Sequence, residues 1–223
     1  MAVPLLDLNT QNRSHQDSLQ EAFARVLDSS QFILGDEVAA FEEAVAERLG
    51  VAHAIGVSSG TDALLLALMA LEVGPGDEVL CPSYTFFATA GCIARLGAEP
   101  VFVDVLPDSF NLDVADAAAK VSARTRAVIP VHLYGQSADM GAVMELAQTH
   151  GLKVVEDCSH AHGAIYKGRK VGTLGDVGCF SLQAHKAVVA GEGGMLVTED
   201  AAIHRRACLL GHFRQPASPT DRE

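Results

Sequence analysis

The chain has 223 residues, with 16 basic and 28 acidic side chains, so its formal net charge is -12 when the histidines are neutral. This length can bury one large α/β core, and the acidity argues against nucleic acid and anionic membranes as partners, because both would repel the chain. The longest wholly apolar run, over residues 63–71, is far too short to span a bilayer. We therefore expect a soluble, cytoplasmic protein whose 5 cysteines, which form no C-x-x-C pair or zinc pattern, are reduced.

Hydrophobic periodicity predicts helices and strands that alternate along the chain. Two amphipathic helices come first, over 14–27 with Ser14 as the N-cap and over 36–49 with Gly50 at its end. Further helices are expected over 61–71, 114–121 and 138–150, and another opens in the 82–90 segment and ends near residue 96. The expected strands cover 54–58, 78–81, 100–105, 127–133, 153–157, 177–182 and 195–197. Strands separated by helices indicate right-handed βαβ units and a largely parallel sheet.

Five residues at the ends of expected strands are candidates for a common site: Ser58, Pro82, Asp104, Tyr134 and Asp157. Ligands of parallel sheets gather at the carboxyl ends of the strands. These residues are therefore expected to converge on one crevice.

A glycine-containing turn joins the first expected strand to the apolar helix over 61–71. Such a turn leaves backbone amides unpaired at the positive end of the helix dipole, which suits a phosphate bound at Gly60 and Thr61. The alternative is an ordinary cap in which Thr61 or Asp62 holds its own helix.

Lys186 lies between the two last expected strands and is followed by a glycine-rich turn. A lysine drawn into a half-apolar crevice loses hydration, so its pKa falls and its amine becomes a nucleophile that can form a Schiff base. A loop lysine that reaches solvent is the alternative. Upstream, Asp157 ends a short apolar strand, where a carboxylate can pair with a buried cation such as a pyridinium nitrogen.

Five motifs in order resemble those of a known family: S-S-G-T-D-A-L over 58–64, P-S-Y-T-F over 82–86, V-H-L-Y-G over 131–135, E-D-C-S-H-A-H-G over 156–163 and S-L-Q-A-H-K over 181–186. With them the chain resembles the DegT/DnrJ/EryC1/StrS aminotransferases, which aminate keto sugars with pyridoxal phosphate. The resemblance implies the α/β large domain of fold type I, with a mixed, mostly parallel seven-stranded sheet and helices on both faces. It also implies a homodimer, a keto sugar that we expect to be nucleotide-linked, and glutamate or glutamine as the amine donor.

The same resemblance assigns roles to seven residues: Gly60, Thr61, Phe86, Asp157, His160, Ser181 and Lys186. It implies that Lys186 binds pyridoxal phosphate covalently and later shuttles a proton, and that Asp157 pairs with the pyridine nitrogen. Phe86 is expected to stack on the ring, whereas its neighbour Phe87 is expected in the core. His160 takes the place near the ring's phenolic oxygen.

The cofactor phosphate is assigned to Gly60, Thr61 and Ser181 in the same way. His162 and His185 have no matched role and are expected to be structural.

Three other interpretations remain open. A related sugar dehydratase would use the same cofactor, but such enzymes carry histidine where this chain has Lys186. A metal site from Asp157, His160 and His162 is conceivable because two histidines two apart on an extended segment share a face. The third is a catalytically impaired or regulatory protein that keeps the cofactor fold.

One cofactor-binding domain is expected over residues 1–214, with an N-terminal helical segment over 1–50 and a polar tail over 215–223. The proteins that the chain resembles continue into a smaller C-terminal domain. We expect that domain to be absent here, and the chain alone to be a poor catalyst.

Overall fold

The computed structural model describes residues 7–211, and the expected polar tail over 215–223 lies outside this range. The contacts divide the described residues into two units, one up to Ala44 and one from Val45 onward. The first unit contains α1 (Leu8–Arg13) and α2 (Gln16–Ser29), and α3 (Asp36–Leu49) runs across the boundary. The second unit contains the sheet and all the elements that form the site described below.

The start of the first expected helix differs from the prediction. Asp7 caps a short additional helix, α1, by accepting a hydrogen bond from the Thr10 amide at 3.1 Å. Ser14, expected as an N-cap, therefore follows the end of α1, and α2 begins after His15 without a side-chain cap. The second expected helix is confirmed as α3, and Gly50 follows it with φ of 77°, a conformation that favours glycine.

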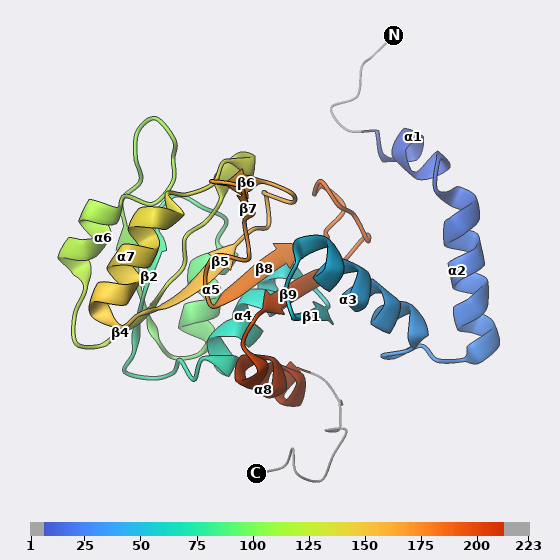
Figure 1. Cartoon of the computed structure of the whole chain (residues 1–223), viewed down its shortest axis with the longest axis horizontal. Helices are drawn as coiled ribbons and strands as arrows, with labels where there is room; N and C mark the ends of the chain where they lie inside the picture. Colours follow the sequence, from blue (N-terminus) through green and yellow to red (C-terminus); the bar gives the residue numbers. More distant parts are fainter. Residues whose placement is uncertain (1–6, 212–223) are drawn as a thin grey trace. The chain divides into compact units, whose positions relative to one another are not determined.

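The described residues form a seven-stranded mixed sheet in the order β1-β9-β8-β5-β4-β2-β3, shown in Figure 1. Its strands are β1 (His53–Val57), β2 (Glu78–Pro82), β3 (Glu99–Val103), β4 (Thr125–Val128), β5 (Lys153–Asp157), β8 (Val177–Ser181) and β9 (Gly194–Thr198). The neighbours from β3 to β8 pair in parallel, whereas β9 is antiparallel to both β8 and β1. The expected mostly parallel sheet is confirmed.

Helices cover both faces of this sheet, as the resemblance implied. They are α4 (Gly60–Ala70), α5 (Ala88–Arg95), α6 (Val114–Lys120), α7 (Met140–His150) and α8 (Ala201–Gly211). Successive strand residues point to opposite faces, so Val155 packs with α4, α5 and α8 while Val154 packs with α6 and α7. Burial on both faces explains the consecutive apolar residues of the inner strands β2 and β5, whereas the edge strand β3 is partly exposed.

One strand ends earlier than expected. The strand predicted over 127–133 stops at Val128, because Pro130 lacks the N–H that a ladder needs. The chain nevertheless stays beside β5, where Val131 forms an isolated bridge with Asp157, and then turns through the 3-10 helix η1 (Leu133–Gly135). This path brings the 131–135 motif to the carboxyl end of β5.

Besides α1 and η1, a helix and a small hairpin have no counterpart among the expectations. They are α8 and a small hairpin of β6 (Ile165–Tyr166) and β7 (Arg169–Lys170). In the hairpin, the Tyr166 hydroxyl donates to Asp139, the N-cap of α7, at 2.5 Å. Across the described part of the chain, no helix has both the length and the apolar character needed to cross a membrane.

Candidate active site

A pocket of about 380 Å³ lies where the carboxyl ends of β5 and β8 meet the first turn of α4. All seven residues assigned from the sequence line it: Gly60, Thr61, Phe86, Asp157, His160, Ser181 and Lys186. They come from four separate segments of the chain, which the fold brings to one pocket. Their individual roles stay predictions, but their convergence is a property of the fold.

The broader expectation about strand ends is wrong for four of its five residues, since only Asp157 lines this pocket. Ser58 points to a second hollow beside Asp62, and Gly60 reaches the main pocket instead. Pro82 ends β2 and Asp104 follows β3, and these strands lie two and three places from β5 in the sheet order. Such a separation is too large for short side chains to share one site.

Lys186 is half-buried on the loop between β8 and β9, with its side chain against the pocket. Burial lowers the pKa of its ammonium group, and the negative charge of Asp157 opposes part of this shift. The direction agrees with the expectation that this amine is partly desolvated. Its backbone amide donates to the Gln183 carbonyl at 2.9 Å, which makes a turn that begins two residues after β8.

Asp157 is buried at the end of β5, and each of its carboxylate oxygens accepts one internal hydrogen bond. The hydroxyl of the buried Thr89 donates to Oδ2 at 3.1 Å, and the Ser159 amide donates to Oδ1 at 3.1 Å. The carboxylate is therefore fixed in orientation while it lines the pocket. Thr89 was not assigned from the sequence, although its place three residues after Phe86 at the start of α5 was a signal.

The first turn of α4 contacts β8 and β9 closely at the pocket. Ser59 is the N-cap, since its hydroxyl accepts the Asp62 amide at 3.0 Å, so the alternative in which Thr61 or Asp62 caps the helix is wrong. The amides of Gly60 and Thr61 have no intrahelical acceptors because they belong to the first turn. A Cβ atom on Gly60 would lie 2.7 Å from the Ser181 Cβ, so only glycine allows this approach. The amides of Gly60 and Thr61 and the nearby Ser181 hydroxyl thus form a cradle of hydrogen-bond donors, called the α4 cradle below.

His160 lines the same pocket with a ring that has no internal hydrogen bond at Nδ1 among the described residues, although that atom is buried. Burial lowers the pKa of this imidazole, Lys186 lowers it further, and Asp157 opposes both. The Tyr134 ring stacks on it, with centroids 5.8 Å apart and planes 10° from parallel. A neutral imidazole with one unpaired nitrogen is thus available at the pocket.

The open metal interpretation is not supported by the geometry. Within residues 7–211, the histidine, cysteine and carboxylate atoms that lie close enough together to share an ion belong to His132, Glu156 and Cys158, and not to the set of Asp157, His160 and His162. His162 instead packs against Phe180, with ring centroids 5.6 Å apart.

The Glu156 carboxylate is the centre of a buried hydrogen-bond network next to the pocket. Its four donors are His132 Nε2 at 2.9 Å and the amides of Gly172, Leu174 and Gly175 at 2.8, 2.6 and 2.7 Å. The other nitrogen of His132 accepts the Ala138 amide at 3.0 Å. Burial acts to raise the pKa of Glu156, but these hydrogen bonds outweigh it and hold the pKa below its usual value. The network ties β5 to the segment that precedes β8.

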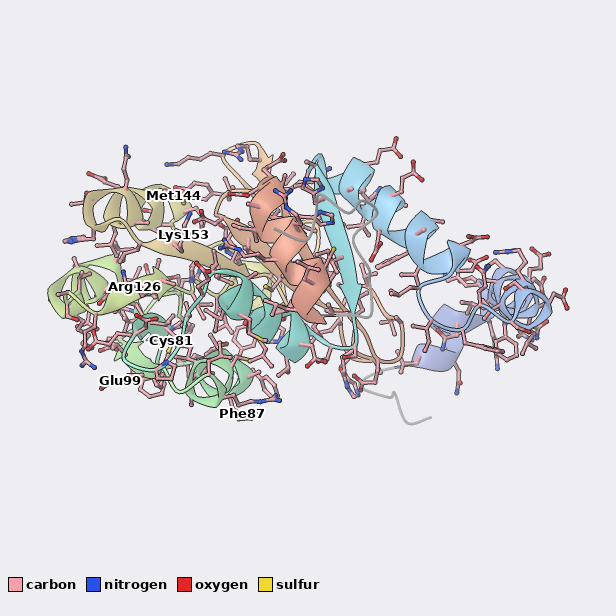
Figure 2. The ribbon with its side chains drawn as sticks, turned by 90° about the horizontal axis from the view of Figure 1, so that it is seen from below. Cys81, Phe87, Glu99, Arg126, Met144 and Lys153 are labelled. Atoms are coloured by element: carbon pink, nitrogen blue, oxygen red, sulfur yellow. The ribbon has the colours of Figure 1, made fainter. Side chains whose placement is uncertain are left out.

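Of the two neighbouring phenylalanines, Phe86 lies at the expected place and Phe87 does not. Phe86 lines the pocket, but Phe87, expected in the core, is 75% exposed. Figure 2 shows Phe87 on the outer side of the molecule, away from the sheet. It packs back along α5, where a Cβ on Gly91 would lie 2.8 Å from its ring. Phe87 is therefore part of the surface, and its hydrophobicity alone gave the wrong prediction.

Other pocket residues were not assigned from the sequence: Ser59, Leu64, Thr85, Ala88, Val131, Ser159, Gln183 and Glu192. Ser59, Leu64, Thr85, Val131, Ser159 and Gln183 lie inside the five motifs, so membership of a motif was a usable signal for them. Glu192 is different, because only the loop between β8 and β9 brings it back to the pocket.

This sheet order and pocket place the chain among the aminotransferases of fold type I. The crystal structure titled S. venezuelae DesV in complex with ketimine intermediate superimposes with a TM-score of 0.92 at 44% sequence identity, covering 97% of this chain and 59% of that chain. The likeness extends over the whole sheet.

The chain belongs to the DegT/DnrJ/EryC1/StrS aminotransferase family, whose profile matches residues 13–220. It is 49% identical to a UDP-N-acetyl-3-dehydro-alpha-D-glucosamine 3-aminotransferase of Acidithiobacillus ferrooxidans, covering 92% of this chain and 56% of that protein. It is 48% identical to a protein of Geobacillus stearothermophilus named pleiotropic regulatory protein, covering 94% and 57%. The chain thus spans a little over half the length of these relatives, and the resemblance expected from the five motifs is confirmed.

Proposed function

We propose that the protein is a pyridoxal-phosphate-dependent aminotransferase that transfers an amino group from glutamate or glutamine to a nucleotide-linked keto sugar. The observation that carries the proposal is the pocket itself, in which a half-buried lysine, a buried aspartate and the first turn of α4 meet. The relative of Acidithiobacillus ferrooxidans, named for a UDP-linked amino sugar, supports the substrate class.

The residues present fit this cofactor. The cradle at Gly60, which an added Cβ would fill, offers first-turn amides and the Ser181 hydroxyl to a phosphate. Asp157 offers a fixed carboxylate to a pyridinium nitrogen, and the unpaired Nδ1 of His160 offers a hydrogen-bonding group to a ring substituent. Phe86 would cover the face of the ring.

In this proposal each residue has a separate task. When bound, pyridoxal phosphate supplies an electron sink during amino transfer. Lys186 Nζ would hold the cofactor, and as a free amine it would take and return a proton during the transfer. Its lowered pKa raises the fraction of neutral amine that can do so near neutral pH. Asp157 holds a positive charge on the ring, and Thr89 and Ser159 prevent the carboxylate from turning away.

A cofactor-binding regulatory protein is the second candidate, because a relative that is 48% identical is named as a regulator. A dehydratase is less well supported, since Lys186 lies in the pocket where such enzymes would need histidine. Turnover separates the two main candidates. An enzyme aminates a keto sugar, whereas a regulator of this fold binds cofactor without doing so.

The test is an amination assay with UDP-, dTDP- and GDP-linked keto sugars and with glutamate or glutamine as donor. We expect product with at least one pair, and none from Lys186→Ala. The Lys153→Ala variant is the matched control, because Lys153 lies at the amino end of β5 and pairs with Asp176 at 2.7 Å. If no pair gives product while the protein still binds pyridoxal phosphate, the regulatory candidate replaces the enzyme.

We further propose a homodimer as the working state, on the basis of the family resemblance. Light scattering after size-exclusion chromatography measures the mass directly. A monomer at micromolar concentration would contradict this part of the proposal.

A further inference from the structure

Tyr134 has a backbone conformation that its residue type disfavours. Its φ and ψ are 54° and 25°, in the left-handed region, inside η1. An L-residue with a bulky side chain rarely adopts this region, and where it does, surrounding contacts hold it there. Burial does not explain the conformation, because the side chain is 71% exposed. The contacts of its ring and hydroxyl are therefore the relevant ones.

Two of these contacts join Tyr134 to different segments. Its hydroxyl lies 3.2 Å from the Tyr84 hydroxyl, in the segment between β2 and α5 that also carries Phe86. Its ring stacks on His160, with centroids 5.8 Å apart and planes 10° from parallel. Tyr84 is supported in turn by Phe110, with ring centroids 5.7 Å apart. Tyr134 thus connects the segment after β2 with the histidine at the pocket.

His160 needs an external constraint on its ring plane. The torsion that sets this plane is broad for histidine, and no internal hydrogen bond at Nδ1 fixes it within the described residues. The charged groups that influence this ring electrostatically are Lys186 and Asp157, and both act on its charge and not on its plane. The parallel Tyr134 ring is the contact that limits rotation.

We propose that Tyr134 is a positioning residue whose ring fixes the plane of the His160 imidazole at the pocket. The inference rests on the proposed function only in taking the pocket as the cofactor site. The stacking itself can be tested without cofactor. The Tyr134 ring carries the effect, so variants that keep this ring and lose only the hydroxyl contact with Tyr84 should behave as the parent.

The first arm of the test measures the histidine rings by NMR in the cofactor-free protein with labelled imidazole nitrogens. The His160 signals are assigned with His160→Gln. Tyr134→Gly removes the ring and relieves the positive φ, so it should fold. We expect Tyr134→Gly to raise the pKa of His160 toward the usual histidine value, because the ring is more solvated. Tyr134→Phe keeps the ring and should leave the pKa unchanged, with Tyr84→Phe close to it.

The matched control is Phe102→Leu, which changes another exposed aromatic residue on β3, away from the pocket. It should leave the His160 signals unchanged. A Tyr134→Gly protein that keeps the parent's His160 chemical shifts and pKa overturns the proposal. So does a shift of equal size in Phe102→Leu, which would show a global response.

The second arm adds pyridoxal phosphate and records the visible absorption band as a function of pH. Tyr134→Gly should shift the band's titration, and Tyr134→Phe should restore the parent profile. If neither the parent nor any variant acquires the visible absorption band, the proposed function is wrong. The NMR measurement still decides whether Tyr134 positions His160. The inference is also wrong if Tyr134→Gly changes the His160 chemical shifts and pKa but its visible band titrates as in the parent. Tyr134 would then not position His160 for the cofactor.

Discussion

The Asp157 carboxylate is held in one orientation by its neighbours. The hydrogen bonds from Thr89 and Ser159 fix both carboxylate oxygens, so the side chain meets a ligand without reorganisation. We predict that Asp157→Asn keeps the fold and retains weakened cofactor binding. The loss in binding free energy should be about 1.5–3 kcal/mol, the range for one charged hydrogen bond. Most of the turnover should disappear, because the amide no longer stabilises a positive ring nitrogen.

The measurements are a cofactor titration followed by the visible band and an amination assay on the loaded protein. Normal turnover by Asp157→Asn would show that this residue does not pair with the pyridine nitrogen. Asp113→Asn is a suitable control, since Asp113 caps α6 at a distance from the pocket.

His160 leads to a pH prediction. Burial lowers the pKa of its imidazole in the folded state, so the unfolded chain binds more protons than the native one between that lowered value and the ordinary 6.5. The free energy of unfolding should therefore rise as pH increases through this window. Urea unfolding of the parent and of His160→Gln across the window measures the difference. Identical pH dependence in the two proteins would contradict the shift.

Some residues of the site could be predicted from the sequence and others could not. Chemistry made Lys186 and Asp157 candidates, because a lysine beside apolar strands can be desolvated and a carboxylate at a strand end can pair with a cation, and the family resemblance then assigned their roles. Thr89 was not assigned to the site, and Tyr134 was expected there only as a strand-end residue, since their contacts are with partners that are 68 and 26 positions away in sequence. Phe87 was misplaced because hydrophobicity does not distinguish a core residue from one on an exposed helix start.

Among the elements, β5 and the segment before β8 are joined by Glu156. We predict that Glu156→Gln lowers the free energy of unfolding by about 3 kcal/mol, because breaking a buried, hydrogen-bonded charge leaves donors unpaired. The pKa of Glu156 is lowered, so its stabilising effect should be present above the usual glutamate pKa and lost as pH falls through the folded value.

Chemical denaturation at neutral pH and under acid conditions measures this effect. Glu99→Gln is the matched control, because Glu99 is an exposed carboxylate on β3 paired with Arg124. Glu99→Gln should lower the free energy of unfolding by at most about 1 kcal/mol. Equal losses in the two variants would show that the buried network contributes nothing particular to stability.

The approach of α4 to β8 gives a prediction for Gly60. An added methyl group would lie 2.7 Å from the Ser181 Cβ and 3.0 Å from its Cα, so the helix start must move. We predict that Gly60→Ala costs about 1–3 kcal/mol in unfolding free energy and weakens the binding of both pyridoxal phosphate and inorganic phosphate.

Thermal unfolding and phosphate titration check the Gly60 prediction. Gly74→Ala is the control, because nothing lies within 4 Å of a Cβ built there. A Gly60→Ala protein with the parent's phosphate affinity would show that the α4 cradle is not the phosphate site.

Element boundaries were predictable where local signals were strong. Both ends of the helix Asp36–Leu49 were predicted correctly, because a clear apolar face precedes Gly50. The strand before Tyr134 was drawn too long, since apolar residues continue after Pro130 while the hydrogen-bond ladder does not. The β6–β7 hairpin was missed because two-residue strands carry no periodicity.

At the scale of the whole molecule, the sheet and its helices were predictable because alternation of apolar strands with amphipathic helices leaves few topologies. The reversed direction of β9 was not, because it depends on the loop that carries Lys186 and on pairing with β1. The net charge of -12 means that any attraction for an anion must be local. In the pocket, Lys186 and the N-terminus of α4 can supply this attraction only if the anion binds at the helix start, because the carboxylates of Asp157 and Glu192 line the same pocket.

Lys186 is the residue that we propose binds the cofactor. The most direct measurement is borohydride reduction of the protein incubated with pyridoxal phosphate, followed by peptide mapping. The account predicts a yellow protein that loses its visible band on reduction and carries the tag on the peptide containing Lys186, with no tag in Lys186→Ala. A tag on Lys167 or Lys170 instead, or an equal tag in Lys186→Ala, would contradict it.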